Sequence, residues 1–436
     1  MHILFLTQII PYPPDAGPRV KTWHVLRYLA SKGYRVTLAS FVRPEEEKHV
    51  AAIREVCQEV YTVPIHRSKV MDISYWVRSH FSGRPFLIER DDLAEMRDLV
   101  KQIIKQDAVD VIHADQLTMT QFALPEYAHN MDFQDDKKNG SGVDNKKEPY
   151  LVFDAHNAVW TIVERMRHNA PWYLKPIAGK EEQRVKRYEG MIISKFNHTL
   201  AVTEPDRKSL GEAVDLFTKG AGDFMNSITV VPIAVDTQKL QSVRRKPGSQ
   251  NIVTLGTLHY PPNADGIRWF AQEVFPLILK EKPDTSLTIL GKNPPADFYQ
   301  LQNKYPQKVD VTGYVEDLTP YLEKAALMVI PVRAGGGMRV RILEAFARGM
   351  PVVTTTVGLE GIKARPGEEI LVEDDPAEFA QAAINLLEDE ALGASLAEKG
   401  RSLAESHYDW QVVLTKMDKI YHRSATQEGE EEMVYA

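Results

Sequence analysis

The chain is poor in cysteine and in long apolar runs, and it carries only a small excess of negative charge. Cys57 is the single cysteine among 436 residues, which excludes an internal disulfide and any cysteine-rich metal site. No apolar stretch approaches the ~20 residues that a transmembrane helix needs. The net charge of -7 argues against nucleic acid as the main partner. These absences favour a cytoplasmic, globular protein.

Several catalytic signatures are also missing. The sequence has no Walker phosphate loop, no Gly-x-Ser-x-Gly elbow and no His-Glu-x-x-His zinc site. It has no Asp-x-Asp pair that would bridge a metal ion to a diphosphate. We therefore expect neither a metal nor an organic cofactor.

The chain begins the same kind of unit twice. An expected strand at 3–6 leads into a proline-rich loop and an amphipathic helix over 20–29, and a strand at 252–255 leads into a similar loop and helix. Chance similarity is the alternative, since strand and turn compositions are repetitive. Further apolar runs alternate with helical stretches and predict strands at 34–39, 109–112, 150–153, 199–202, 286–290, 309–311, 327–332 and 352–354.

Alternation of strands and helices is typical of parallel sheets, so we predict an α/β protein of two facing Rossmann-like domains with a ligand cleft between them. The expected division is 1–225, 226–405, a returning helix at 406–423 and a disordered tail at 424–436. Residues 131–147 are almost devoid of apolar side chains and predict a mobile insertion. The apolar start of the chain predicts a first strand and not a signal peptide.

One segment combines glycines, arginines and a carboxylate between two expected strands. Glycines where a strand turns into a helix let a ligand approach the backbone, and the helix start favours an anion such as a diphosphate. The two arginines would bind that diphosphate, and the glutamate would accept from both hydroxyls of a ribose. The alternative is a flexible loop with solvated arginines. The segment comprises Gly335, Gly336, Gly337, Met338, Arg339, Arg341 and Glu344.

With its Gly-Gly-Gly-x-Arg-x-Arg-x-Leu-Glu-Ala pattern, this segment resembles the retaining glycosyltransferases of the GT-B fold, family four. The resemblance implies transfer of a sugar from a nucleoside-diphosphate sugar to a glycan, lipid or small-molecule acceptor, as in polysaccharide and cell-envelope biosynthesis. The family often has a glutamate eight positions before Glu344, and Gly336 stands there. The carboxylate that usually holds the donor sugar is therefore absent.

The resemblance extends to positions along both halves of the chain. Most relatives carry cations after the strand at 252–255, where this chain has Gly256 and Thr257, so the two loop arginines would stabilise the leaving diphosphate alone. The resemblance implies catalytic roles for Arg339, Arg341, His156 and His113. It implies donor contacts by Gly17, Gly256, Tyr314, Val315, Gly335, Gly336, Gly337, Met338 and Glu344. It places Asp154, Asn157, Asp115 and Glu204 on the acceptor side.

Simpler roles remain open for four of these residues. Gly17 would equally fit a plain turn, and His113 a histidine satisfied by local backbone. Asp154 would also fit a cap of the helix expected near 159, and Glu204 a first-turn acid of a capped helix.

Two other functions stay open: a nucleotide-sugar epimerase of the same fold, and a sugar-nucleotide-binding scaffold without catalysis. The segment 160–196 combines aromatic and basic residues, which fits either a peripheral membrane association or a basic solvated face. The expected partners are thus a sugar nucleotide and a glycan or lipid-linked acceptor, and no nucleic acid.

Overall fold

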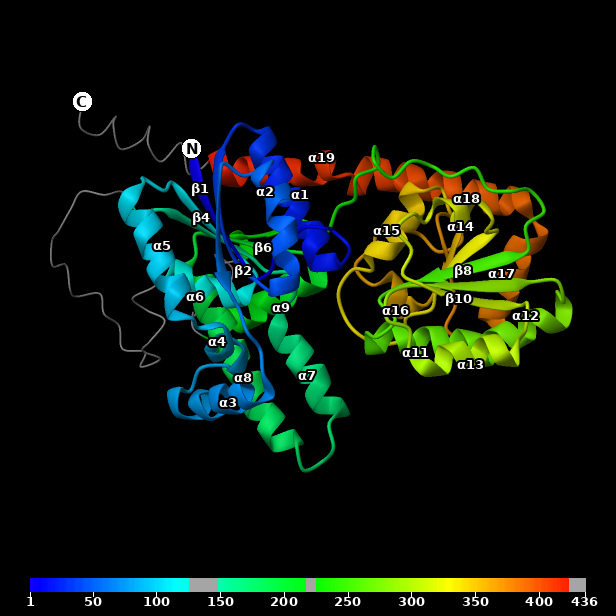
Figure 1. Cartoon of the computed structure of the whole chain (residues 1–436), viewed down its shortest axis with the longest axis horizontal. Helices are drawn as coiled ribbons and strands as arrows, with labels where there is room; N and C mark the ends of the chain where they lie inside the picture. The colour runs from blue at the N-terminus through cyan, green and yellow to red at the C-terminus, as the bar shows by residue number, and fades with distance from the viewer. Residues whose placement is uncertain (125–147, 217–224, 423–436) are drawn as a thin grey trace. The chain divides into compact units, whose positions relative to one another are not determined.

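A computed structural model describes residues 1–124, 148–216 and 225–422 (Figure 1). The chain separates into two compact units. Unit 1 comprises Met1–Pro232 and the segment that begins at Leu414, and unit 2 comprises Ile233–Val413. The insertion expected at 131–147 and the tail expected at 424–436 lie outside the described residues or at their edge.

Both unit boundaries differ from the sequence-based ones. The first boundary follows Pro232 and not residue 225, because strand β7 (Ile228–Val230) pairs with β6 (His198–Ala201) of unit 1. The chain returns to unit 1 at Leu414 and not at 406, because Asp409 pairs with Val235 inside unit 2.

Unit 1 is built on a parallel sheet whose described strands follow the order β3-β2-β1-β4-β5-β6-β7. Its central strand β1 is buried at every residue, as expected for a parallel sheet with both faces covered. In register, Leu4 of β1 lies between Thr37 of β2 and Ile112 of β4. The strands not yet bounded are β1 (His2–Thr7), β2 (Arg35–Val42), β3 (Glu59–Pro64), β4 (Val111–Asp115) and β5 (Tyr150–Asp154).

Helices of unit 1 cover this sheet, and α3, α7 and α8 extend away from it (Figure 1). The described helices are α1 (Gly17–Ser31), α2 (Val50–Arg54), α3 (Lys69–Ser82), α4 (Phe86–Asp91), α5 (Ala94–Gln106), α6 (Thr120–Ala123), α7 (Val159–Asn169), α8 (Lys175–Lys195) and α9 (Glu204–Val214). Helix α1 begins at Gly17, earlier than the expected residue 20, because Pro18 in the first turn is compatible with a helix start.

Unit 2 contains a second parallel sheet, with the described order β10-β9-β8-β11-β12-β13. Its strands are β8 (Asn251–Leu255), β9 (Ser286–Leu290), β10 (Val309–Gly313), β11 (Leu327–Ile330), β12 (Val352–Thr354) and β13 (Leu371–Val372). Its helices include α11 (Pro261–Trp269), α12 (Phe275–Glu281), α13 (Ala296–Lys304), α14 (Thr319–Glu323), α15 (Val340–Ala347), α16 (Thr356–Leu359), α17 (Pro376–Glu388), α18 (Glu390–Leu403) and α19 (Trp410–Val413). Every strand that the sequence predicts is present.

We predict that Gly266→Ala destabilises unit 2. Gly266 lies in α11 so close to β11 that an added Cβ would be 1.9 Å from the carbonyl oxygen of Pro331. The atoms that the Cβ would meet are all backbone atoms, which cannot move aside as a flexible side chain can. We therefore expect a loss of about 1–3 kcal/mol in the free energy of unfolding, measured in urea.

The matched control is Gly393→Ala in helix α18. An added Cβ there meets its nearest atoms at 3.7 Å and 3.8 Å, which is ordinary contact, so this change should be neutral or stabilising. Equal stability of the two variants would contradict the prediction.

Candidate functional site

At the carboxyl edge of the first sheet, Asp115 is the centre of a buried polar cluster. Its Oδ2 accepts hydrogen bonds from the hydroxyls of Thr7 (2.8 Å) and Thr22 (3.0 Å), and its Oδ1 lies 2.7 Å from Nε2 of His156. Asp115 ends β4, Thr7 ends β1 and Thr22 lies in α1. Neighbouring parallel strands bring these groups together because their carboxyl ends meet at one edge.

Next to Asp115, the ammonium of Lys21 pairs with Oδ1 of Asp154. Both side chains are buried, at 2% and 0% exposure. Burial raises the pKa of the Asp154 carboxyl, but the charges of Lys21 and the neighbouring histidines lower it more, so this pKa lies below its ordinary value. Asp154 is therefore ionised, and Lys21 supplies the compensating charge.

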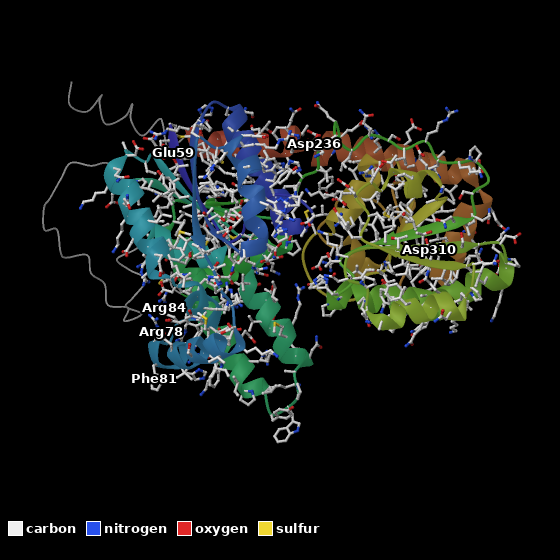
Figure 2. All side chains as sticks on the ribbon, viewed as in Figure 1. Glu59, Arg78, Phe81, Arg84, Asp236 and Asp310 are labelled. Carbon is white, nitrogen blue, oxygen red and sulfur yellow. The ribbon has the colours of Figure 1, made fainter. Side chains whose placement is uncertain are left out.

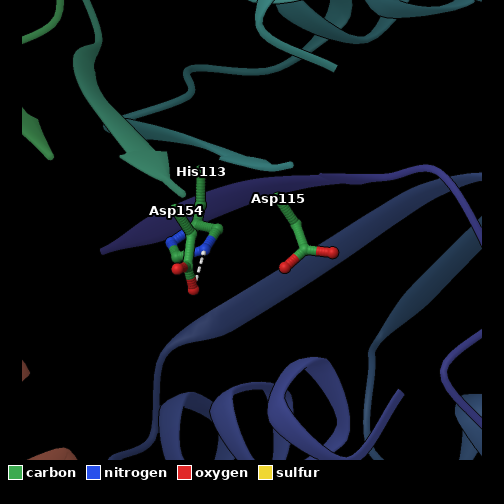
Figure 3. A group of neighbouring side chains, drawn as sticks. All are labelled: His113, Asp115 and Asp154. Carbon is green, nitrogen blue, oxygen red and sulfur yellow. Dashed lines mark ion pairs between the residues drawn. The ribbon is translucent and has the colours of Figure 1, made fainter. Parts of the chain in front are cut away.

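His113 completes the cluster from inside the sheet. Its Nε2 lies 3.5 Å from Oδ2 of Asp154 (Figure 3). Its Nδ1 lies 2.6 Å from the hydroxyl of Tyr421. Its ring stacks on Phe5 at 4.3 Å between centroids. Burial, followed by the nearby charge of Asp154, raises the pKa of Tyr421 well above its ordinary value, so the phenol stays protonated. His113 is thus held by side chains and not by local backbone.

The position of His113 differs from the expected one. We predicted a strand over 109–112 with His113 at its end, whereas β4 runs to Asp115 and His113 lies within it at 0% exposure. The strand continues because the two polar residues find buried partners at the sheet edge. Direct contact of His113 with a ligand would therefore require the cluster to open.

Ligand atoms of His113, Asp115 and Asp154 lie within 4.8 Å of one another, a spacing that a metal ion could use. The three side chains are drawn in Figure 3. Donors of the protein already face two of them: Lys21 pairs with Asp154, and Thr7 and Thr22 donate to Asp115. A metal ion here would have to displace the Lys21 ammonium, which carries the positive charge of the cluster.

The loop after β5 is fixed by two acids from other helices. Glu189 of α8 accepts the N–H groups of Val159 and Trp160, both at 2.8 Å, and so caps α7. Asp206 accepts the N–H of Ala158 at 3.2 Å. Asp154 therefore does not cap α7, which was the simpler role considered for it. These contacts hold His156 and Asn157, immediately before α7, at the sheet edge.

Glu204 has the simpler of its two expected roles. Thr203 caps α9 by accepting the N–H of Asp206, and Glu204 is the first-turn acid of that helix. Its side chain is 60% exposed and lies 3.5 Å from Arg207. No contact joins it to the Asp115 cluster within the described residues.

Gly17 is the first residue of α1 and so lies at a helix start, as the donor-binding role requires, and not in a plain turn. Arg19, in the first turn of the same helix, pairs with Asp15 at 3.1 Å and with Glu46. The cation closest to Gly17 in the sequence is therefore already compensated by two carboxylates.

In unit 2, the glycine loop lies between β11 and α15. Gly335 and Gly337 have φ values of 99° and 83°, which other residues rarely adopt. Helix α15 begins at Val340 with Arg339 as its N-cap, later than the start expected near Gly337. The Nη1 of Arg339 donates to the carbonyl of Gly336 at 2.8 Å, so this arginine orders the loop that was expected to bind the diphosphate.

Arg341 and Glu344, one turn apart in α15, form an ion pair with 2.5 Å between Nη1 and Oε2. Both are partly exposed, at 30% and 19% of their side chains. The pair places a guanidinium and a carboxylate side by side, as binding of a diphosphate and a ribose would need. Met338 is buried and anchors the loop just before them.

Three adjacent strands of unit 2 end in glycine. Gly256 follows β8, Gly291 follows β9 and Gly313 ends β10. The N–H of Gly291 donates to the carbonyl of Gly313 at 2.9 Å, and an added Cβ on Gly291 would be 1.9 Å from the carbonyl oxygen of Gly256. At this glycine edge the strand ends pack closely on one another, and of the three glycines only Gly313 has open space where a Cβ would lie.

The expected base-binding turn adjoins this glycine edge. Tyr314 is 63% exposed, and Val315 after it is half-buried. The ammonium of Lys292 lies 4.6 Å from the centre of the Tyr314 ring, a cation–π contact. Lys292 is therefore stacked on an aromatic ring and is not simply solvated.

The structure thus brings part of the expected residues together in each unit, while Glu204 stays apart from the first group. His113, Asp115, Asp154 and His156 lie together in unit 1. The loop residues 335–339, Arg341 and Glu344 lie together in unit 2. Their roles in binding and catalysis stay predictions.

Sequence reasoning missed the residues that support the first group: Thr7, Lys21, Thr22, Glu189 and Tyr421. A signal existed for Lys21, which shares a helix face with Val25 and Tyr28 and so places a charge on an otherwise buried stripe. Tyr421 had no such signal, because 308 residues separate it from His113.

Comparison with known proteins finds similarity to part of the sequence. Residues 249–389, within unit 2, match the family described as Glycosyl transferases group 1. An uncharacterised 44.6 kDa protein in the cps region of Klebsiella pneumoniae is 26% identical over 175 residues, 39% of this chain and 45% of that protein. A glycogen synthase of Mycobacterium tuberculosis is 27% identical over 216 residues, 48% of this chain and 51% of that protein. The chain thus spans about half the length of these curated relatives.

Solved structures are similar over nearly the whole chain. HepE of Anabaena in complex with UDP has a TM-score of 0.66 at 13% identity, covering 97% of this chain and 100% of that one. Sucrose-phosphate synthase of Thermosynechococcus elongatus has a TM-score of 0.65 at 16% identity, covering 97% and 99%. At such low identity the similarity shows the fold alone. This shared fold confirms the predicted pair of Rossmann-like α/β domains. The family match covers residues 249–389, and the fold match covers nearly the whole chain.

Among the helices of the described residues, none is both long enough and apolar enough to span a bilayer.

We predict that Lys21→Met destabilises unit 1 by about 3–5 kcal/mol, because it leaves the Asp154 carboxylate buried without its partner. Urea unfolding of both proteins measures the difference. The double variant Lys21→Met with Asp154→Asn should recover much of the loss, since it removes the stranded charge as well. A loss for Lys21→Met within about 0.5 kcal/mol, as for an ordinary surface change, would contradict the ion-pair assignment.

The raised pKa of Glu189 predicts that the stability of the protein depends on pH. Burial raises the pKa of this side chain to about 8, despite the two backbone N–H groups that lower it. The folded state then binds a proton that the unfolded chain, with an ordinary glutamate, releases near pH 4.5, so this residue's stabilising contribution decreases as the pH rises from about 4.5 to 8. The melting temperature of Glu189→Gln, compared with the wild type across this range, should show a smaller decrease with pH. Parallel curves for the two proteins would refute the shifted pKa.

Proposed function

We propose that this protein transfers a sugar from a nucleoside-diphosphate sugar to a glycan or lipid-linked acceptor, with retention of anomeric configuration and without a metal ion. The observation that carries the proposal is the glycine loop with Arg339, Arg341 and Glu344, inside the segment that matches group 1 glycosyltransferases. The function belongs to polysaccharide or cell-envelope biosynthesis in the cytoplasm, which the likeness to a cps-region protein supports.

The donor would bind at the carboxyl edge of the second sheet. The backbone of the glycine edge would take the base and the phosphates, with Tyr314 and Val315 beside the base. Glu344 would accept from the ribose hydroxyls, and Arg341, paired with Glu344, would keep that carboxylate in place and face the diphosphate. Arg339 would hold the loop through the carbonyl of Gly336 and add positive charge as the nucleoside diphosphate leaves.

A uridine nucleotide is the first candidate donor. HepE of Anabaena, which shares the fold, has been solved with UDP, with UDP-glucose and with UDP and glucose. The identity to HepE is 12–13%, so the base and the sugar in this chain require their own measurement.

The acceptor would bind at the carboxyl edge of the first sheet. With Nε2 of His156 turned toward Asp115, its Nδ1 is the ring nitrogen that would meet an acceptor hydroxyl. Asn157 would add a hydrogen bond next to it, and Gly17 would let a phosphate approach the start of α1. A lipid-linked acceptor would bring the protein to a membrane surface, the peripheral association that is one of the two roles considered for the segment 160–196.

We predict that the wild type binds one of the UDP-, GDP- and ADP-sugars in a calorimetric screen, and that Glu344→Ala and Arg339→Ala lose that binding. Loss of the ribose carboxylate should lower the affinity at least about tenfold, as expected for a charge-assisted hydrogen bond of 1.5–3 kcal/mol. Glu398→Ala, which removes an exposed glutamate of α18, is the matched control and should bind normally.

If both variants bind the donor as tightly as the wild type does, the proposal is wrong. Binding without transfer to any acceptor would favour the non-catalytic scaffold, for which Gly336 in place of the family's glutamate is the supporting observation. Turnover of the sugar nucleotide without an acceptor would favour the epimerase.

A further inference from the structure

Helix α3 of unit 1 has its apolar face outside. Four of its six large exposed apolar residues recur at helical spacing and share one side of the helix: Val70, Ile73, Val77 and Phe81. On the opposite side Ser79 is buried, and Asp72 and Tyr75 are half-buried. Phe81 is 89% exposed, and Figure 2 shows it at the outer end of unit 1. A soluble helix normally has the reverse arrangement, so this face is suited to a partner.

A second exposed apolar group lies at the turn between α7 and α8. Trp172, which is 82% exposed, packs edge-on against Tyr173. The exposed apolar residues of this region are Ile162, Met166, Trp172, Tyr173, Leu174 and Ile177. Aromatic rings with a polar atom are the side chains that favour the interface between water and lipid.

The α7–α8 hairpin that carries these residues is firmly built. Arg167 pairs with Glu182 at 2.5 Å, and the ammonium of Lys186 lies 3.8 Å from the centre of the Trp160 ring. Gly179 lets the stem of Arg167 pack closely, since an added Cβ would be 3.4 Å from it. The tip is therefore presented by a rigid support and needs little ordering when it binds.

Helix α3 and the hairpin belong to one surface. Arg184 of α8 donates to the hydroxyl of Ser79 in α3 at 3.4 Å. Glu181 of α8 accepts the N–H of Phe86, just after α3, at 2.6 Å. In Figure 1 both elements lie at the same end of unit 1. We call this combined surface, residues 69–82 and 162–177, the apolar foot.

The exposed charged side chains around the apolar foot are all basic. Within the described residues 66–82 and 161–187, every exposed acid or base other than histidine is a lysine or an arginine: Arg67, Lys69, Arg78, Arg165, Lys175, Lys180 and Arg187. The acids of these segments are only half-exposed, and Glu182 and Glu181 face Arg167 and Arg184. The whole chain is acidic, so this local excess of base is specific to the foot.

We propose that the apolar foot docks unit 1 onto a bilayer that contains anionic lipid. Exposed apolar and aromatic side chains would enter the headgroup region, and the surrounding lysines and arginines would bind the lipid phosphates. A second copy of the chain is a poorer occupant, because a symmetric contact would bring two basic surfaces together.

This inference deepens the proposed function, and it rests on that function for the acceptor class. Helix α7 begins directly after His156 and Asn157, and its 11 residues end at the foot. At ~1.5 Å per residue, the candidate acceptor site lies roughly 16 Å along the helix from the docked end. An acceptor with a membrane-embedded lipid and a phosphate-linked sugar head fits this arrangement.

The test is sedimentation of the full-length protein with vesicles of phosphatidylcholine, with and without phosphatidylglycerol. We expect binding to the anionic vesicles that weakens with added salt. Phe81→Glu and Trp172→Glu should each lower the partition coefficient about tenfold by placing a charge among the inserting residues. Tyr299→Glu, the same change at an exposed site of α13 in unit 2, is the control and should bind like the wild type.

Folding is checked by the melting temperature, which such exposed changes should leave unaltered. The docking proposal is overturned if the wild type does not sediment with anionic vesicles, or if both foot variants sediment as it does. Dimerisation that Phe81→Glu abolishes, without vesicle binding, would assign the foot to a second copy instead. Donor calorimetry on the same variants is independent of lipid, so a failure of docking is distinguishable from a failure of the proposed transferase.

Discussion

The buried ion pair between Lys21 and Asp154 is the constraint on which the first unit depends. It joins helix α1 to the end of β5, while Thr22, the next residue of α1, joins the helix to Asp115 at the end of β4. A charge pair at 2% and 0% exposure is tolerated only when both partners stay in place. The same contacts therefore fix α1, the loop before α7 and the orientation of His156.

The two sheet edges have opposite chemistry, although both follow from parallel strands. The edge of unit 1 is lined by buried carboxylates, imidazoles and hydroxyls, whereas that of unit 2 is glycine backbone with guanidinium groups in the following helix. Backbone N–H groups and arginines suit an anion, and carboxylate-held imidazole suits a hydroxyl. This difference is the physical reason to place the nucleotide in unit 2 and the acceptor in unit 1.

The sequence predicted the strands that are buried along their whole length. The strands that it missed are β3, β7 and β13, which are all edge strands of their sheets. An edge strand is partly exposed and lacks the unbroken apolar run of a central one, as the exposed residues of β3 show. Strand β10, the remaining edge, was found because Val309 and Val311 alternate with polar residues.

The site was predictable only within single segments. Local motifs placed Asp115, Asp154 and His156 at strand ends, and Arg339 and Glu344 around a glycine loop. Contacts between distant segments were not predictable, such as Tyr421 on His113 or Glu189 on the start of α7. For the same reason the sequence could not show that His113 is buried.

Helix α3 shows why a periodic pattern alone does not tell which face is inside. Its apolar residues share one side, a pattern that normally predicts a buried face. Polar contacts decide otherwise: the hydroxyl of Ser79 donates to the carbonyl of Arg84 at 2.6 Å, and Arg84 is itself buried against Asp92 and Gln121. Turning the helix over would bury the stripe but would take the Ser79 hydroxyl away from the carbonyl of Arg84 and bring the exposed Lys69 and Arg78 toward the protein interior. The apolar face therefore stays outside, available to another surface.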